Sequence, residues 1–344
     1  MKKTRLLAIV FIFLLSHCAQ DFQNTPPAPD SSTSPAVQVE DDLVKSTGEN
    51  GCTRNTITPD EGKYHRDQFG TAFKTWLKSK GYSTYTKTFY ASTSPQSTVK
   101  SFSGWGGANE GTTACKPTHN PVIFIHGNTD SAQDWAFNGP LAAIGAPRQD
   151  FVNSGFNANE IYALSVNSPN AMSVTNNHHP KDQIEKIKNF ILAVKTYTGK
   201  AKVSIIAHSL GVTMARRAIY DYNLTSSIDV FVGIAGANAG LTACGTYPAP
   251  MVPTKTCGAY FFWGWPIYVD GLAINSPHLL KMMGKKLATR LYSIRGINDE
   301  LNMANLPSGY FSAADDNIWV NTTSGHYGLM HSTGRLQVEL VTGN

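Results

Sequence analysis

From residue 121 onward, short apolar runs alternate with segments whose apolar residues recur every three or four positions. Short runs rich in β-branched residues are typical of buried strands, whereas the longer spacing is typical of amphipathic helices. Strands and helices that alternate in this way predict an α/β fold: a mostly parallel sheet flanked by helices, with long loop insertions. The predicted strands are residues 122–125, 161–166, 203–207, 230–234 and 291–294.

Two helices are prominent in this pattern. The first carries an apolar stripe and ends at Gly199, a residue that can terminate a helix in a left-handed conformation. The second begins beside Leu210 and continues to Tyr222, and we expect Arg216 and Arg217 on the side opposite its apolar stripe. Each helix therefore covers the sheet with one face. The stripe of the first helix consists of Ile184, Ile187, Ile191, Val194 and Tyr197.

The amino terminus has the pattern of an export signal. Three basic residues within positions 2–5 precede an unbroken apolar run over residues 6–15, which is too short to span a bilayer as a mature helix. The run leads into Leu-Ser-His-Cys at residues 15–18, which resembles the lipobox of bacterial lipoproteins, where cleavage precedes a cysteine that becomes lipidated. His17 departs from that pattern, which usually has a small residue there. Cleavage nearby without lipidation of Cys18 is the alternative.

The sequence divides into three predicted parts: a signal peptide over residues 1–17, a flexible tether over 18–50 and a folded catalytic domain over 51–344. The tether is rich in Pro, Ser, Thr and Asp, so it cannot bury enough apolar surface to offset the entropy of ordering. We therefore expect an exported monomer, either held at the cell envelope by a lipid on Cys18 or secreted.

The cysteine count fits this prediction. Five cysteines is an odd number for an exported protein, and lipidation of Cys18 leaves four that can pair. We expect Cys52 to pair with Cys115 and so fix the amino end of the domain. We expect Cys244 to pair with Cys257 and close a short loop rich in Pro and Thr.

Charge and motifs exclude several function classes. The net charge is +5, but the basic residues are scattered and no nucleic-acid motif is present, so nucleic acid is not an expected partner. The sequence contains no H-E-x-x-H motif, phosphate loop or dinucleotide fingerprint. His178 and His179 are adjacent but lack further ligands at metal spacing, so we expect them in a solvated loop and predict no metal site and no cofactor.

The strongest chemical signal is Ala-His-Ser-Leu-Gly at residues 207–211, between a predicted strand and a predicted helix. In a nucleophile elbow of α/β-hydrolases, a serine occupies such a tight turn, and small residues are needed on either side because the two backbones crowd it. Ala207 stands where glycine is more usual. The alternative is that Ser209 is an ordinary helix N-cap.

A nucleophilic serine also needs donors for the oxyanion of its tetrahedral intermediate. We expect one from the backbone N–H of Leu210. The second is assigned to the backbone N–H of Asn128, in the loop after residues 122–125, with Gly127 or Thr129 as alternatives. His126 in the same loop is predicted to be structural.

The base and its orienting acid are expected after the serine, in the chain order that α/β-hydrolases use. Asp299 follows a predicted strand and is the favoured acid; His326 follows a Ser-Gly turn, where its ring can face the cleft, and is the favoured base. His331 lies one turn into the predicted last helix and is expected to be packed or solvated. The alternative acids are Glu300, Asp315 and Asp316.

Four segments, residues 120–132, 194–215, 296–302 and 323–329, resemble extracellular polyhydroxybutyrate depolymerases that act on native granules and, more distantly, class 2 bacterial lipases. The resemblance implies an α/β-hydrolase without a separate polymer-binding domain, with Ser209, Asp299 and His326 as the triad. Leu210 replaces a methionine of those relatives, which leaves its backbone N–H available.

These observations predict a serine carboxylic-ester hydrolase that acts on lipid esters or polyhydroxyalkanoate. A lipase or esterase acting on acylglycerols is the first alternative, because its chemistry is identical. A hydrolase-fold lipoprotein that binds surfaces without activity is the alternative from another class. The aromatic stretch over residues 260–268 is either an exposed surface for lipid or polyester or a buried insertion.

Overall fold

The computed structural model describes one compact unit, which lies within Thr47–Asn344. The described residues are 52, 69–82, 88–91, 99–102, 104–136, 145–168, 171–301, 308–321 and 323–344. The predicted signal peptide, the tether and Cys18 lie outside the described residues, so they stay predictions. No helix in the described part of the chain is long and apolar enough to cross a membrane.

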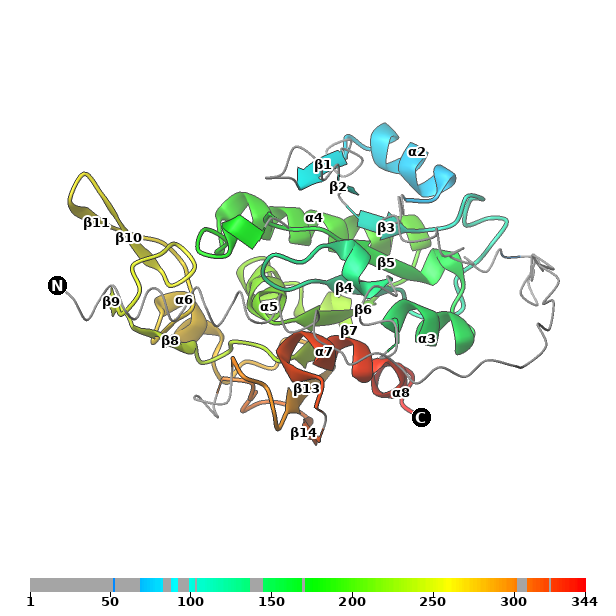
Figure 1. The fold of residues 1–344 in the computed structure, drawn as a ribbon. Helices are drawn as coiled ribbons and strands as arrows, with labels where there is room; N and C mark the ends of the chain where they lie inside the picture. The colour runs from blue at the N-terminus through cyan, green and yellow to red at the C-terminus, as the bar shows by residue number, and fades with distance from the viewer. Residues whose placement is uncertain are drawn as a thin grey trace, which may run out of the picture. The chain divides into compact units, whose positions relative to one another are not determined.

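A seven-stranded sheet organises this unit (Figure 1). Its strand order is β14-β13-β7-β6-β4-β5-β3, and every neighbouring pair is parallel except β3 with β5. The predicted parallel sheet is therefore confirmed. The strands are β3 (Gly104–Gly106), β4 (Val122–Ile125), β5 (Ile161–Leu164), β6 (Val203–His208), β7 (Ile228–Ile234), β13 (Arg290–Gly296) and β14 (Asp316–Val320).

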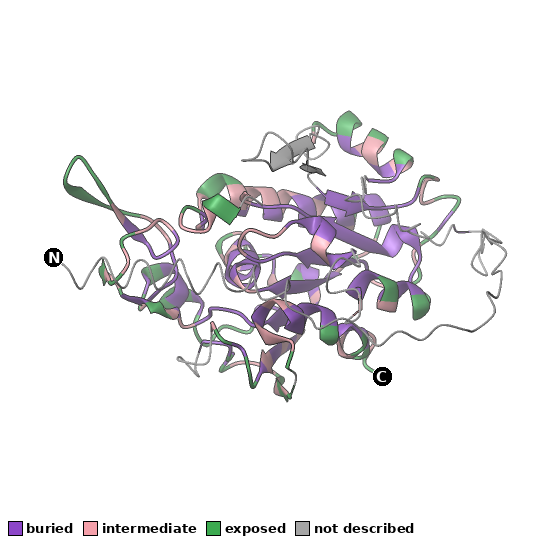
Figure 2. Cartoon of the chain, viewed as in Figure 1, coloured by how far each residue is buried: buried purple, intermediate pink, exposed green. Residues whose placement is uncertain are grey.

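Helices cover both faces of the sheet because its strands are apolar on both sides. In β4, Ile123 and Ile125 pack into one buried cluster with Ile187, whereas Phe124 packs into a second cluster with Trp135 on the opposite face. The first face carries α2 (Thr71–Ser79), α4 (Lys181–Thr198) and α5 (Leu210–Asp221). The second carries α3 (Pro147–Asn153), α7 (Gly325–Ser332) and α8 (Gly334–Thr342), and the central strands β4, β5 and β6 between the two layers are buried (Figure 2).

Most predicted elements match the structure, with three differences. Gly199 ends α4 with φ +67°, as expected, but β5 stops at Leu164 because the N–H of Val166 donates to His126 Nε2 instead of a neighbouring strand. The predicted last helix is two helices, which meet at Thr333. Arg216 is buried, not solvent-facing: its guanidinium lies over the Phe311 ring and donates to Asn238 Oδ1 and the Met282 carbonyl.

An insertion separates β7 from β13. It holds a three-stranded sheet and a two-stranded hairpin, β10–β11, that extends away from the main sheet (Figure 1). The Cys244–Cys257 disulfide closes the first part of this insertion, which confirms the predicted pair. Its elements are β8 (Leu241–Thr246), β9 (Ala249–Pro250), β10 (Ala259–Phe262), β11 (Trp265–Tyr268), β12 (Ala273–Ile274) and α6 (Pro277–Met282).

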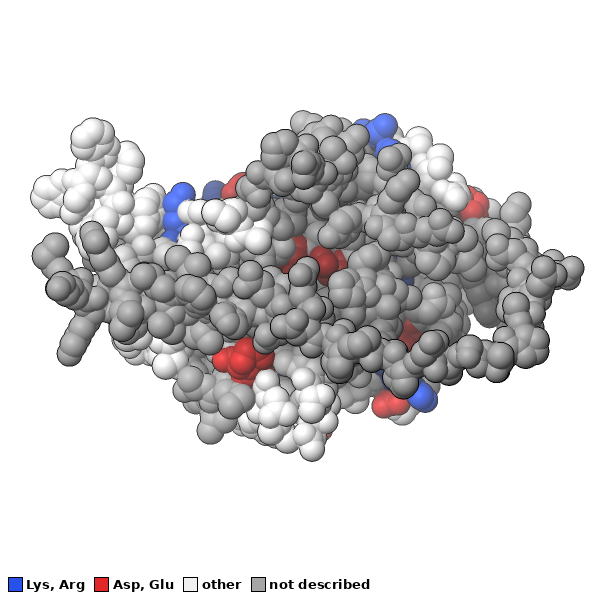
Figure 3. Space-filling view, in the orientation of Figure 1, with Lys and Arg blue, Asp and Glu red and all other residues white. Residues whose placement is uncertain are grey.

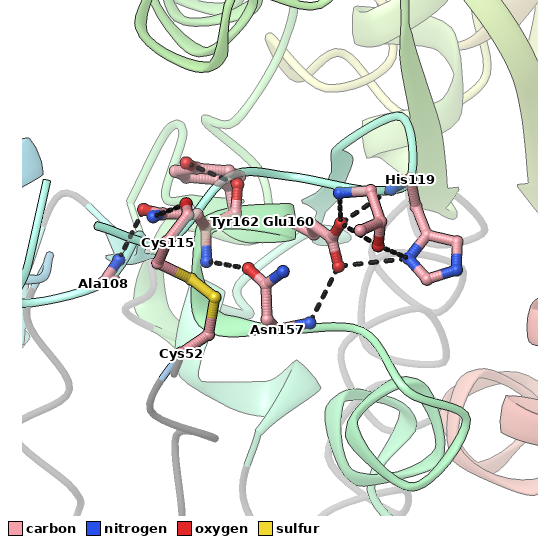
Figure 4. Close-up of a disulfide and its surroundings, with 9 residues drawn as sticks. Cys52, Ala108, Cys115, His119, Asn157, Glu160 and Tyr162 are labelled. Atoms are coloured by element: carbon pink, nitrogen blue, oxygen red, sulfur yellow. Dashed lines mark hydrogen bonds and ion pairs between the residues drawn. A yellow bond between two sulfur atoms is a disulfide. The ribbon is translucent and has the colours of Figure 1, made fainter. Parts of the chain in front are cut away.

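The Cys52–Cys115 disulfide, also as predicted, lies beside a buried polar network (Figure 4). Asn159 donates to the Cys115 carbonyl, and its side-chain oxygen accepts from the Ala108 N–H. These bonds fix the loop after β3 against the start of β5. The remaining described elements are β1 (Thr88–Ala91) paired with β2 (Val99–Phe102), and four short 3₁₀ helices over Ala132–Trp135, Ala158–Glu160, Ala171–Ser173 and Thr225–Ser227.

Candidate active site

Ser209 occupies a strained turn between β6 and α5. Its φ is +51° and its ψ −123°, in the half of backbone space that non-glycine residues rarely adopt. A Cβ on Gly211 would lie 2.2 Å from the His126 carbonyl oxygen, so only glycine fits there. Ser209 stands at the N-cap position of α5, but its side chain makes no capping bond to the helix, so it does not act as an ordinary N-cap. The turn instead leaves Ser209 partly exposed at the end of β6.

Three predicted side chains converge at this turn. His326 Nε2 lies 2.8 Å from Ser209 Oγ, and His326 Nδ1 lies 2.8 Å from Asp299 Oδ1. Because a carboxylate only accepts, Nδ1–H donates to Asp299, which leaves Nε2 to accept from the serine hydroxyl. Asp299 follows β13, and His326 is in the first turn of α7. The structure thus brings together three residues separated by up to 117 positions.

His326 is buried, contrary to the expected exposure of its ring toward the cleft. Burial opposes protonation of the ring, yet its pKa is raised above the ordinary value because the carboxylates of Asp299, Glu300 and Asp130 favour the charged form. The site therefore stabilises an imidazolium, the species that forms when a histidine takes a proton from a hydroxyl.

The alternative acids and base have other partners. Glu300 Oε2 accepts from the backbone N–H of His326 at 2.8 Å, not from its ring. Asp315 pairs with Lys286 and accepts from the Leu291 N–H, so its carboxylate is structural. Asp316 is exposed at the start of β14. His331 is buried, as expected of a packed residue, and its ring donates to the Gly145 carbonyl.

The loop after β4 lies directly against the nucleophile. A Cβ on Gly127 would lie 3.1 Å from the Cβ of Ser209, so the loop backbone approaches the serine as closely as a glycine permits. The side chain of Asn128 is held by the Val174 carbonyl and by Asn177. Within the described residues, the N–H of Asn128 donates to no protein acceptor, and that of Leu210, the first helical residue of α5, has no intrahelical partner.

Two histidine predictions have different outcomes. His126 is structural: its Nδ1–H donates to the Gly127 carbonyl, its Nε2 accepts from Val166, and burial lowers its pKa to about 4 despite the Asp130 charge. The prediction of a solvated loop is wrong for His179, which is buried between the Asp270 carbonyl and the Thr213 hydroxyl. No group of three or more metal-ligating side chains occurs in the described residues.

The sequence did not indicate a set of polar residues around His326. His208 Nε2–H donates to the His326 carbonyl at 3.0 Å, and Asp130 Oδ2 lies 3.7 Å from His208 Nδ1. Each stands within two residues of a predicted site residue, which is the only signal that could have suggested a role. Their arrangement depends on packing between β6, α7 and the loop after β4.

The aromatic stretch forms the β10–β11 hairpin and is exposed, so the buried alternative is wrong. Trp263 at its turn is 88% exposed and Trp265 is 75% exposed. Residues 257–269 carry no charged side chain, and the hairpin is white in Figure 3. An uncharged apolar surface of this kind is uncommon on soluble proteins. The other large apolar side chains at least half exposed here are Phe261, Phe262 and Tyr268.

Comparisons with known proteins identify a family for this chain. The family model described as Lipase (class 2) matches residues 119–333, which include the serine, the acid and the histidine. Among solved structures, a CIB-like hydrolase from Thermoplasma acidophilum is 15% identical, with 65% of this chain and 87% of that chain covered and a TM-score of 0.39.

Two lipases of known structure are similarly distant. The mature lipase BlEst2 of Bacillus licheniformis is 14% identical, with 65% of this chain and 91% of that chain covered and a TM-score of 0.41. Lipase B of Aspergillus fumigatus is also 14% identical, with 65% of this chain and 52% of that chain covered and a TM-score of 0.41. No curated protein sequence matches the chain. The family match and the mostly parallel sheet flanked by helices show that the chain has the α/β-hydrolase fold and belongs to the class 2 lipase family of ester hydrolases.

Proposed function

We propose that the protein is a serine carboxylic-ester hydrolase with Ser209 as nucleophile, His326 as general base and acid, and Asp299 as the orienting acid. The observation that carries the proposal is the continuous chain of hydrogen bonds from Ser209 through His326 to Asp299 on a strained strand–helix turn. Structural serines at helix starts do not require this arrangement.

In this mechanism, Ser209 Oγ attacks the ester carbonyl while His326 Nε2 takes the hydroxyl proton. The backbone N–H groups of Asn128 and Leu210 stabilise the oxyanion. His326 then returns the proton to the leaving alkoxide, so an alcohol departs and an acyl-enzyme remains. Water attacks the acyl-enzyme by the same roles and releases the carboxylic acid. No step requires a cofactor.

The substrate is proposed to be an insoluble ester, either lipid or polyhydroxyalkanoate. The exposed hairpin supports this proposal, because the free energy falls when an uncharged aromatic surface moves from water into an apolar interface. Hydrogen bonds connect the start of the hairpin to the site. The hydroxyl of Thr256 donates to the carbonyls of Val174 and Asn177. The Val174 carbonyl also accepts from the side chain of Asn128.

We further propose that the chain is exported and held at the cell envelope by a lipid on Cys18. The apolar run after basic residues and the cysteine that follows it support this proposal. Replacement of Cys18 by Ala should then move the protein from the membrane fraction to the soluble fraction. Unchanged partitioning would argue for secretion without an anchor.

The catalytic proposal is tested by hydrolysis of p-nitrophenyl butyrate. The Ser209→Ala variant should lose activity by about 10⁴-fold or more, because removal of a nucleophile leaves only binding and oxyanion stabilisation. Ser332→Ala is a suitable control, since Ser332 is exposed on α7, the helix that carries His326. Equal, measurable rates for Ser209→Ala and the wild type would refute the catalytic assignment of Ser209, whereas no hydrolysis by the wild type would favour an inactive surface-binding lipoprotein.

The substrate proposal is tested with the triple variant Phe262→Ser, Trp263→Ser, Trp265→Ser. Its rate on p-nitrophenyl butyrate should match the wild type, whereas its activity on emulsified triglyceride or amorphous hydroxybutyrate granules should fall about tenfold or more. Fatty-acid titration measures the first insoluble substrate and turbidity loss the second. The substrate with the higher wild-type rate decides between lipase and depolymerase. Undiminished activity on both would refute the role of the hairpin.

A further inference from the structure

We infer that His208 and Glu300 are positioning residues that hold the main chain of His326 in register with Ser209. The inference rests on the proposed catalytic role of His326. The backbone N–H of His326 donates to Glu300 Oε2 at 2.8 Å, and its backbone carbonyl accepts from His208 Nε2 at 3.0 Å. With Asp299 and Ser209 on the ring, every polar group of His326 has a partner.

Close packing holds both Glu300 and His208 against the backbone of His326. Gly325 precedes His326 with φ +65°, and a Cβ there would lie 2.9 Å from Glu300 Oε2, so the carboxylate fills the space beside the first turn of α7. His208 is fully buried, and its ring centre lies 4.9 Å from that of His326. The residue before the nucleophile therefore contacts the base directly, which couples the positions of Ser209 and His326.

The contact with the His326 carbonyl fixes the protonation of His208 Nε2. A carbonyl only accepts, so Nε2 carries a proton, and a neutral His208 would have a bare Nδ1. That Nδ1 faces Asp130 Oδ2 at 3.7 Å, and within the described residues neither atom has a hydrogen-bond partner. Asp130 thus approaches the ring nitrogen of His208 that does not bind the His326 carbonyl.

Other titratable groups surround the same pair. His126 and Asp134 approach from the loop after β4 and the turn beyond it, and His331 approaches from α7. Burial and the nearby Asp130 charge raise the pKa of Asp134 to about 7. On the opposite side, Asp299 and Glu300 face His326 from the loop after β13. The carboxylates of Asp130 and Glu300 thus flank the site without forming a hydrogen bond to the imidazole ring of His326.

The first experiment compares His208→Gln with His208→Leu. Glutamine can return a donor to the His326 carbonyl, whereas leucine has similar bulk and no donor. Loss of the donor should lower kcat for p-nitrophenyl butyrate by about 10–100-fold with KM unchanged, since small displacements of a reacting group have effects of this size. The glutamine variant should recover most of kcat. Titration with a p-nitrophenyl phosphonate counts folded, reactive sites, so a loss of folded protein is separated from a loss of rate.

The second experiment compares Glu300→Gln with Glu300→Ala. Glutamine keeps an oxygen for the His326 N–H but removes one of the charges that, with Asp299 and Asp130, raise the pKa of His326. In Glu300→Gln, the acidic limb of the pH profile of kcat/KM should move to lower pH while kcat is retained. In Glu300→Ala, the limb should move in the same way and kcat should also fall about tenfold. Asp130→Asn should move the limb in the same direction. Equal kcat for the two Glu300 variants, with an unmoved limb, would overturn the inference.

A spectroscopic readout separates this inference from the proposed function. The Nδ1–H proton of His326 should give a downfield NMR resonance that disappears in His326→Gln, remains in His208→Gln and shifts or broadens in His208→Leu. If Ser209→Ala proved fully active, the catalytic proposal would fail while this resonance still reported on the main-chain partners. An identical resonance in the wild type and His208→Leu would contradict the positioning role of His208.

Discussion

The turn around Ser209 and the insertion that carries the β10–β11 hairpin solve different physical problems. Around Ser209, close glycine contacts and hydrogen bonds fix the turn, and the polar groups of His326 are all paired. In the hairpin, large aromatic side chains are left in water. Chemistry requires exact placement of a few atoms, whereas adhesion to an apolar phase requires area. The two regions should therefore fail independently.

The largest expected effect is on the chemistry of the first region. Asp299→Asn should lower kcat about 10⁴-fold, because an amide that donates to His326 Nδ1 imposes the wrong tautomer on the ring. Binding to triglyceride emulsion, measured by co-sedimentation, should be unchanged because the hairpin is untouched. A loss of binding comparable to the loss of rate would show that the regions are not separable.

The converse change is removal of the disulfide that closes the insertion. The double variant Cys244→Ser, Cys257→Ser removes a 13-residue cross-link and should lower the free energy of unfolding by about 3 kcal/mol. We expect emulsion binding to weaken while kcat on p-nitrophenyl butyrate in folded protein is retained. Urea unfolding followed by fluorescence measures the first effect. A parallel fall in kcat would indicate that the insertion supports the site through Thr256.

A smaller effect is expected from a methyl group beside Ser209. Gly211→Ala would place a Cβ 2.2 Å from a backbone oxygen of the loop after β4, so backbone must shift, at about 1–3 kcal/mol of stability. Gly199→Ala is a useful comparison, because its Cβ meets no neighbour and only its φ of +67° is unfavourable. Both should lower the unfolding midpoint, but only Gly211→Ala should also reduce kcat.

The smallest effect concerns pH. His326 must be neutral to act as a base, and its pKa is raised above 6.5, so the acidic limb of kcat/KM should lie above that pH. Protonation of His326 lowers activity but stabilises the fold, because its pKa is raised in the folded state. This stabilisation is lost as pH rises through the folded pKa. A limb below 6.5 would contradict the influence of the surrounding carboxylates.

Much of the site followed from local sequence, and the rest did not for identifiable reasons. The motif at residues 207–211 could be interpreted because close contact between strand and helix restricts residue size within five positions. The burial of Arg216 and His179 could not be predicted, because each side chain depends on a partner in a distant segment. The partner is Asn238 for the arginine and Asp270 for the histidine. Nor could the aromatic stretch be placed, since hydrophobicity is the same for a buried and an exposed hairpin.

The sequence by itself determined the order of the central strands and helices and the serine turn, because periodicity and residue size act over short distances. Asp299 and His326 followed from their place after the serine in the chain order that α/β-hydrolases use. Only the tertiary structure decided that Glu300 contacts the main chain of His326 rather than its ring, and that His208 contacts the same residue from the opposite side. Such contacts are set by the relative positions of α7, β6 and β13, which arise from packing across the sheet and leave no local pattern in the chain.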